Sequence, residues 1–122
     1  MKILSRKFHA VLDYMSGIVL IAAPWALHFE EVTAATTTAI VAGALILLMS
    51  LMTSYEGGII RIVPMPMHLN MDVLLGLILA ASPWLVGFNY EVYLPHLIMG
   101  ILTLLSGLTT VRSSLHKLAT GV

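Results

Sequence analysis

The 122-residue sequence contains no cysteine and few charged residues. Without cysteine it can form no disulfide and offers no thiolate to a metal, and it gives no indication of the redox compartment. Only 10% of the residues are charged, and six basic and six acidic residues cancel, so nothing indicates a nucleic-acid partner. The sequence also lacks a nucleotide-binding loop and a nucleophile spaced to meet a base. We therefore identify no enzyme and expect no cofactor.

Hydrophobic residues are abundant instead, at 59% of the chain. A soluble domain of this size leaves a large share of its surface exposed, so it could not hide this much apolar surface. Four apolar segments, at about 8–29, 34–55, 69–88 and 93–111, approach the roughly 20 residues that a helix needs to cross a bilayer. We predict an all-α integral membrane protein with four transmembrane helices in contact with the lipid bilayer.

The basic residues indicate an orientation for these helices. All six lie on one side of the predicted spans: Lys2, Arg6, Lys7, Arg61, Arg112 and Lys117. The loops on the other side carry only acidic charges, at Glu30, Glu31 and Glu91. Because positive residues favour the cytoplasmic side, we predict a multi-pass protein with both termini cytoplasmic, in the inner membrane if the source is bacterial.

One stretch occurs twice. "HAVLDYMSGIVLIAAPWALHF", from His9, aligns without a gap with "HLNMDVLLGLILAASPWLVGF", from His68, and eight of the 21 positions are identical. After a small gap, "GALILLMSLMT" from Gly43 resembles "GILTLLSGLTT" from Gly100. The repeated unit is thus a helical hairpin.

The repeat predicts the architecture. Each unit has an even number of spans, so both copies enter the membrane from the same side and form a parallel repeat. We predict a single membrane domain over residues 1–122, a four-helix bundle with one hairpin at 1–56 and the other at 57–122. In the connector, Gly57 and Gly58 are predicted to end the second helix. Pro64 and Pro66 are predicted to keep the chain extended up to the third helix.

The Pro-Trp pair near the end of the first helix of each unit carries a resemblance. With "ASPWLVGF" following an apolar helix, the chain resembles the SPW repeat family of small membrane proteins over nearly its whole length. Ser82, Pro83 and Trp84 match the motif, whereas the other copy has Ala23 before Pro24 and Trp25. The resemblance implies a membrane location and a two-helix unit, and it implies no activity. We expect both tryptophans to anchor the helices at the outer membrane surface.

A polar stripe follows one face of each repeated helix. His9, Asp13, Gly17, Leu20 and Pro24 share one face, and the second copy repeats this with His68, Asp72, Gly76, Leu79 and Pro83. A charge that faces lipid costs about 2.5–3.5 kcal/mol, so we expect the two stripes to face each other inside the protein. The glycines would let the helix backbones approach closely.

Three interpretations of the two histidines and two aspartates remain open. They could form a buried polar clasp that fixes helix register. They could form a proton relay or ion path. They could also bind a metal with two imidazoles and two carboxylates, which makes His9, Asp13, His68 and Asp72 the candidate metal ligands.

The sequence favours a structural or accessory membrane module that associates with itself or with a larger membrane partner. Nearly every repeated residue already has a packing or anchoring role in this interpretation. The alternative is a small channel or carrier for protons, ions or metal that uses the paired histidines and aspartates.

Overall fold

The computed structural model describes residues 4–111 and contains four α-helices in that range. They are α1 (Arg6–Ala26), α2 (Thr33–Met52), α3 (Met65–Ser82) and α4 (Leu94–Thr109), with a π-helical turn, η1 (Pro83–Gly87), directly after α3. The described part of the chain contains no β-strand beyond isolated bridges. The chain is all-helical, as predicted. Lys2, Arg112 and Lys117 lie outside the described residues.

Three helical segments are long and apolar enough to cross a membrane: α1, α2 and the 23 residues of α3 with η1. The fourth predicted span forms α4, a shorter apolar helix of 16 residues. The length and composition of these helices are those of a small helical membrane protein.

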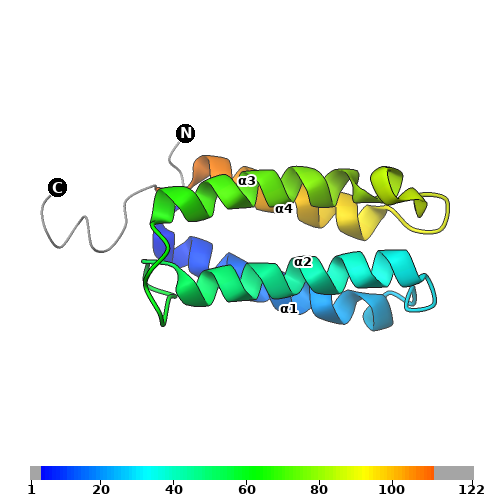
Figure 1. The fold of residues 1–122 in the computed structure, drawn as a ribbon, viewed down its shortest axis with the longest axis horizontal. Helices are drawn as coiled ribbons and strands as arrows, with labels where there is room; N and C mark the ends of the chain where they lie inside the picture. Colours follow the sequence, from blue (N-terminus) through cyan, green and yellow to red (C-terminus); the bar gives the residue numbers. More distant parts are fainter. Residues whose placement is uncertain (1–3, 112–122) are drawn as a thin grey trace, which may run out of the picture.

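The helices pair as two antiparallel hairpins that lie side by side (Figure 1). α1 packs against α2, and α3 packs against α4, while the two hairpins meet each other less extensively along α2–α3 and α1–α4. In this order α1 and α3 lie diagonally across the molecule. Side chains from the two repeated helices therefore meet between the two hairpins.

Glycines bring the two helices of each hairpin into close contact. A Cβ on Gly43 would lie 2.7 Å from the Gly17 carbonyl oxygen, and a Cβ on Gly76 would lie 2.7 Å from that of Gly100. Real Cβ atoms do not approach so closely, so the side-chain-free backbone is required at these crossings. Gly43 of α2 and Gly100 and Gly107 of α4 are thus covered by the partner helix of their own hairpin.

The repeated helices end in matching turns. His28 follows α1 with a φ of 59°, and Gly87 occupies the corresponding position of the other copy with a φ of 96°. Both are left-handed conformations that commonly terminate helices. Pro24 does not end its helix, because it lies in the last turn of α1, which continues to Ala26. In the other copy α3 ends at Ser82, and Pro83 begins the π-helical turn.

The connector differs from the prediction. α2 ends at Met52 rather than at Gly57 and Gly58, because Thr53 is extended and forms a parallel bridge with Val63. The glycines serve the turn instead: a Cβ on Gly58 would lie 1.8 Å from the Thr53 carbonyl oxygen.

The two prolines of the connector also behave differently from the prediction. Pro64 is the extended N-cap of α3, but Pro66 lies inside the first turn of that helix. Proline is tolerated there because the first helical turn has no internal partner for its N–H groups. The third helix therefore starts at Met65, earlier than the predicted span.

The start of the described chain pairs with its end in the same way as the two sides of the connector. Leu4 bridges Thr110 in parallel, just as Val63 bridges Thr53. Both bridges lie at the end of the molecule that holds the connector (Figure 1). Each hairpin thus has its first residues fixed to the last residues of the other hairpin.

The outer faces of all four helices carry large apolar side chains that are exposed: Val11 and Ile18 on α1, Leu45 and Leu48 on α2, Leu74 and Leu77 on α3, and Ile98 and Leu102 on α4. Buried apolar residues such as Leu20, Ile46 and Leu79 fill the interior between the helices. An exposed surface of this composition suits hydrocarbon rather than water.

Candidate functional site: a buried His–Asp centre

The structure brings the histidines and aspartates of the two repeated stripes together inside the molecule. His9 and Asp13 come from α1, and His68 and Asp72 come from α3; we call these four residues the His–Asp centre. One ligand atom from each residue lies within 4.8 Å of the other three. None of the four residues is more than 5% exposed.

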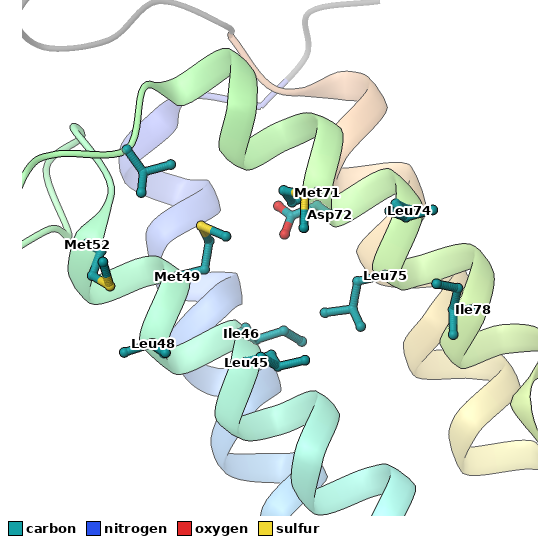
Figure 2. Close-up of a pocket in the computed structure, with 11 residues that line it drawn as sticks. Leu45, Ile46, Leu48, Met49, Met52, Met71, Asp72, Leu74, Leu75 and Ile78 are labelled. Carbon is teal, nitrogen blue, oxygen red and sulfur yellow. The ribbon is translucent and has the colours of Figure 1, made fainter.

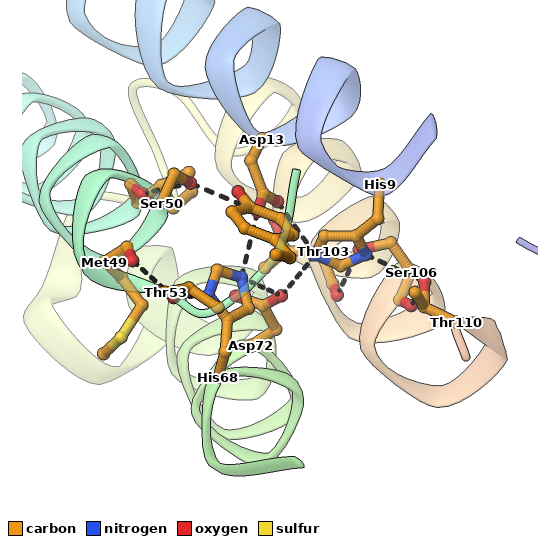
Figure 3. Close-up of polar contacts among 12 residues, drawn as sticks. His9, Asp13, Met49, Ser50, Thr53, His68, Asp72, Thr103, Ser106 and Thr110 are labelled. Atoms are coloured by element: carbon orange, nitrogen blue, oxygen red, sulfur yellow. Dashed lines mark hydrogen bonds and ion pairs between the residues drawn. The ribbon is translucent and has the colours of Figure 1, made fainter. Parts of the chain in front are cut away.

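Each histidine contacts the aspartate of both copies (Figure 3). His9 Nε2 lies 3.1 Å from Oδ1 of Asp13 in its own helix and 2.8 Å from Oδ2 of Asp72. His68 Nε2 lies 3.1 Å from Oδ2 of Asp72 in its own helix and 2.9 Å from Oδ2 of Asp13. The contacts between copies connect α1 to α3 across the diagonal of the structure.

Two threonines determine how the imidazole rings are protonated. His68 Nδ1 lies 2.6 Å from Oγ1 of Thr53, and His9 Nδ1 lies 2.8 Å from Oγ1 of Thr110. Each hydroxyl donates its single proton to a backbone carbonyl one turn back, that of Met49 or of Ser106. The hydroxyl can only accept from the imidazole, so Nδ1 carries a proton in both rings.

The two carboxylates have different surroundings. Asp13 Oδ2 accepts a hydrogen bond from the Tyr55 hydroxyl at 3.1 Å, and the Ser50 hydroxyl shares its single proton between Asp13 Oδ2 at 3.1 Å and the Ile46 carbonyl oxygen at 2.8 Å. Gly107 occupies the place of Ser50 in the other copy and offers no hydroxyl, and its Cβ would lie 3.1 Å from the Asp72 Cβ. In the described part of the chain no hydroxyl donates to Asp72. The centre is thus built on a repeat but is not symmetric.

The partners of the centre were not identified from the sequence. Thr53 and Thr110 end the two segments that align after the small gap, so the repeat contained a signal for both. Ser50 and Tyr55 belong to one copy only, and Tyr55 follows the end of α2. No repeat pattern could have identified these two residues.

Two grooves on opposite sides of the molecule reach the centre. The groove between α2 and α3, about 430 Å³ in volume, has Asp72 among lining residues that are otherwise nearly all apolar (Figure 2). The groove between α1 and α4, about 280 Å³ in volume, is lined by leucines and by five polar residues: Asp13, Ser16, Thr103, Ser106 and Thr109. Corresponding residues of the two copies line the two grooves.

The SPW residues lie away from the centre, at the end of the molecule opposite the connector. Pro24 and Pro83 are fully buried, whereas Trp25 and Trp84 are about half exposed, at 55% and 52%. The buried Ser82 hydroxyl donates to the Leu79 carbonyl of its own helix at 2.7 Å. Since this bond is local, Ala23 can replace the serine in the first copy without leaving a partner unpaired.

Of the other predicted residues, Gly17 and Gly76 lie at the helix crossings described above. A further buried histidine, His96, was not singled out from the sequence. Its ring packs against Phe29 and Phe88 at centroid distances of 5.5 and 4.7 Å, and its Nε2 donates to the Ala35 carbonyl oxygen at 2.9 Å. It lies at the end opposite the connector and does not belong to the His–Asp centre.

With both Nδ1 atoms donating to threonine, the Nε2 atoms can meet the carboxylates in two ways. They can act as the N–H donors of imidazolium rings, in which case two positive and two negative charges balance. They can also present lone pairs, which share a proton or a cation with the carboxylates. The centre therefore has the groups required for a clasp, for proton exchange or for binding a cation.

The fold and the site define a small helical protein with membrane-type helices and a buried polar centre. The family model of the SPW repeat domain matches residues 7–110, so the chain belongs to the SPW repeat family. Neither a curated protein nor a solved structure matches the chain at a significant level.

Proposed function

We propose that the protein is a multi-pass membrane protein, a four-helix bundle made from a duplicated hairpin, and that it works as a structural or accessory module. The His–Asp centre holds the two hairpins together, while the outer faces meet lipid and a membrane partner or a second copy. The observation that carries this proposal is the pair of contacts across the diagonal, His9 to Asp72 and His68 to Asp13. They connect the hairpins where the helices contact each other least.

The internal duplication is supported by equivalent contacts in the two copies. The bridges Leu4–Thr110 and Val63–Thr53 correspond, as do the two threonine–histidine contacts. Such correspondence is expected when two copies of one hairpin pack about a pseudo-two-fold axis.

The charges near the helix ends support a topology with the connector and both termini in the cytoplasm. Arg6 begins α1 and Arg61 lies in the connector, whereas Glu30, Glu31 and Glu91 lie in the loops at the opposite end. This asymmetry follows the positive-inside tendency. The half-exposed tryptophans at the acidic end suit the outer headgroup layer.

Any association with a partner has to use large apolar side chains, because the glycine faces are covered within the hairpins. Membrane helices associate mainly through packing and hydrogen bonds, so a partner needs a surface complementary to these side chains. The test is photo-crosslinking in native membranes, followed by mass determination of the full chain in mild detergent. We expect a complex larger than one chain. A strict monomer without any crosslinked partner would contradict the proposal that the protein works as a structural or accessory module.

The clasp is tested by the double variant Asp13→Asn plus Asp72→Asn. Removing one partner of a buried ion pair typically costs about 3–5 kcal/mol, so we expect thermal unfolding at a clearly lower temperature. Glu30→Gln plus Glu91→Gln is the matched control, because it removes two carboxylates from the loops. Equal melting of the two double variants would contradict a clasp.

A second candidate function is a small channel or carrier for protons, ions or a metal. The observation that favours it is the grouping of four ionisable side chains inside apolar helices, where such residues often mark a transport path. Proteoliposome flux that disappears in Asp13→Asn plus Asp72→Asn, with the fold retained, would support transport. Unchanged flux in that variant would exclude a role for the centre.

A further inference from the structure

We propose that the His–Asp centre binds one divalent transition-metal ion of the zinc class, with both imidazoles and both carboxylates as ligands. This inference goes beyond the structural role above. It rests on the donor set, on the orientation of the rings and on one imidazole nitrogen that lacks a well-aligned partner.

The donor atoms of the four residues lie close together inside the protein. A tetrahedral zinc ion with ligands at about 2.0–2.2 Å places neighbouring ligand atoms about 3.3–3.5 Å apart. The four nitrogen–oxygen distances between these side chains are 2.8, 2.9, 3.1 and 3.1 Å. These contacts use both oxygens of Asp13, and a set with one atom from each residue spans up to 4.8 Å, so shifts of about 1 Å would bring the four donors to tetrahedral spacing.

The threonines orient both rings for coordination. A metal-bound histidine usually donates its other ring N–H to a fixed acceptor, which sets the tautomer and directs the lone pair at the metal. Thr53 accepts from His68 Nδ1 and Thr110 accepts from His9 Nδ1, so both Nε2 atoms point toward the carboxylates. The Ser50 and Tyr55 hydroxyls hold Asp13 in a similar way.

His68 Nε2 provides a separate observation. It is buried and has no hydrogen-bond partner of acceptable geometry, although carboxylate oxygens lie at 2.9 and 3.1 Å. At these distances only a poor angle prevents a hydrogen bond, so the nitrogen is directed between the two carboxylates. A cation between the carboxylates would give this nitrogen a partner.

The charge of the centre fits a divalent ion. Two carboxylates, two neutral imidazoles and one divalent cation sum to zero, which avoids an uncompensated charge among apolar helices. His9 and His68 lie in the first turns of α1 and α3, so the centre lies about one helical turn from the connector end.

The direct test is Co²⁺ titration of the full chain, purified in mild detergent and first treated with a chelator. Bound Co²⁺ reports its coordination through visible absorption, and elemental analysis gives the number of ions per chain. We expect one ion per chain with a tetrahedral spectrum that zinc abolishes by displacing the cobalt. Absence of binding, or an octahedral spectrum, would overturn the proposal.

Variants separate the centre from adventitious binding. Thr53→Val and Thr110→Val keep all four ligands but remove the acceptor of one ring, so each should weaken binding about 10- to 100-fold. His68→Gln should abolish it. His96→Gln is the control, because it changes a buried histidine outside the centre and should leave the affinity unchanged.

The threonine variants keep the test decisive if His68→Gln fails to fold, which circular dichroism would show. Unchanged affinity in both threonine variants would overturn the site. That result would not contradict the structural role, because the structural role is tested separately, by crosslinking and by the melting of the aspartate variants.

Discussion

Tyr55 shows how much a single buried hydroxyl contributes to the polar centre. Its side chain is fully buried, and its hydroxyl donates to Asp13 Oδ2. Burial, together with the neighbouring Asp13 carboxylate, raises the pKa of this hydroxyl above its ordinary value. The Tyr55 hydroxyl therefore stays protonated in the folded protein over a pH range in which an unfolded tyrosine ionises.

Tyr55→Phe should consequently change both stability and its pH dependence. At neutral pH we expect a loss of about 1.5–3 kcal/mol, the usual contribution of a hydrogen bond to a charged acceptor. In the wild type the unfolded state loses the tyrosine proton first, so stability should fall as the pH rises above about 10. The variant should lose less over this range. Thermal melts from about pH 8 to 11 measure the difference.

Tyr90→Phe is the control for this experiment, because Tyr90 is 95% exposed. Its melting curve should follow that of the wild type at every pH. If the melting temperature of the Tyr55 variant fell with rising pH as steeply as that of the wild type, ionisation of the buried hydroxyl would not be linked to folding.

At the scale of the elements, the close helix contacts inside the two hairpins differ in how well they tolerate an added side chain. A Cβ on Gly100 would lie 2.3 Å from the backbone nitrogen of Ala80, which cannot move without shifting α3. A Cβ on Gly17 would first meet the side chain of Leu47, at 2.5 Å. A side chain can change rotamer, so the first contact is the more rigid one.

Gly100→Ala should therefore destabilise the protein more than Gly17→Ala. Overpacking of a tight contact costs about 1–3 kcal/mol, and we expect the upper part of this range for Gly100→Ala. The measurement is the midpoint of unfolding in a detergent titration of both variants. Equal losses of stability in the two variants would show that both helix contacts adjust equally well to an added methyl group.

The left-handed turns after the repeated helices offer a second comparison between elements. His28 adopts a conformation that costs a non-glycine residue about 1–2 kcal/mol, whereas Gly87 adopts its counterpart without that cost. His28→Gly should therefore raise the free energy of unfolding by about 1 kcal/mol. Leu27→Gly, at a φ of −108°, is the control and should not stabilise. A thermal melt of the two variants distinguishes them.

At the scale of the whole molecule, the chain forms a closed ring of two hairpins. Leu4 pairs with Thr110 as Val63 pairs with Thr53, so the start and the end of the described chain are adjacent. The connector turn also contains exposed residues, with Ile59 at 78% and Ile60 at 59%. Proteins with adjacent ends often tolerate circular permutation.

A circular permutant that opens between Ile59 and Ile60 and joins residue 122 to residue 1 should fold. It should keep the contacts of the His–Asp centre, because none of them depends on which connection is covalent. Circular dichroism and the melting temperature measure the outcome. A permutant opened inside α3, between Leu74 and Leu75, should fail. If neither permutant folded, the proposal that the two hairpins form a closed ring would be contradicted.

The repeat allowed much of the molecule to be predicted. The helical hairpin and the polar stripes were visible in the aligned sequences, whereas Gly17 and Gly76, expected to bring the two repeated helices together, contact α2 and α4 of their own hairpins instead. The helix ends were less predictable. α2 stops at Met52 because Thr53 pairs with Val63, and Pro66 is accepted inside the first turn of α3. These outcomes depend on contacts between segments rather than on local preference.

The sequence by itself determined that the chain forms apolar helices and that two aligned stretches each carry a histidine and an aspartate one turn apart. Residue periodicity reflects helix geometry, and residue type reflects the free energy of transfer from water to an apolar environment. Both can therefore be read from the sequence alone. The tertiary structure alone decided that each histidine contacts the aspartate of both copies, and that Asp13 receives two hydroxyl donors while Asp72 receives none in the described chain. Those contacts follow from how the two hairpins are placed against each other, which no local pattern encodes.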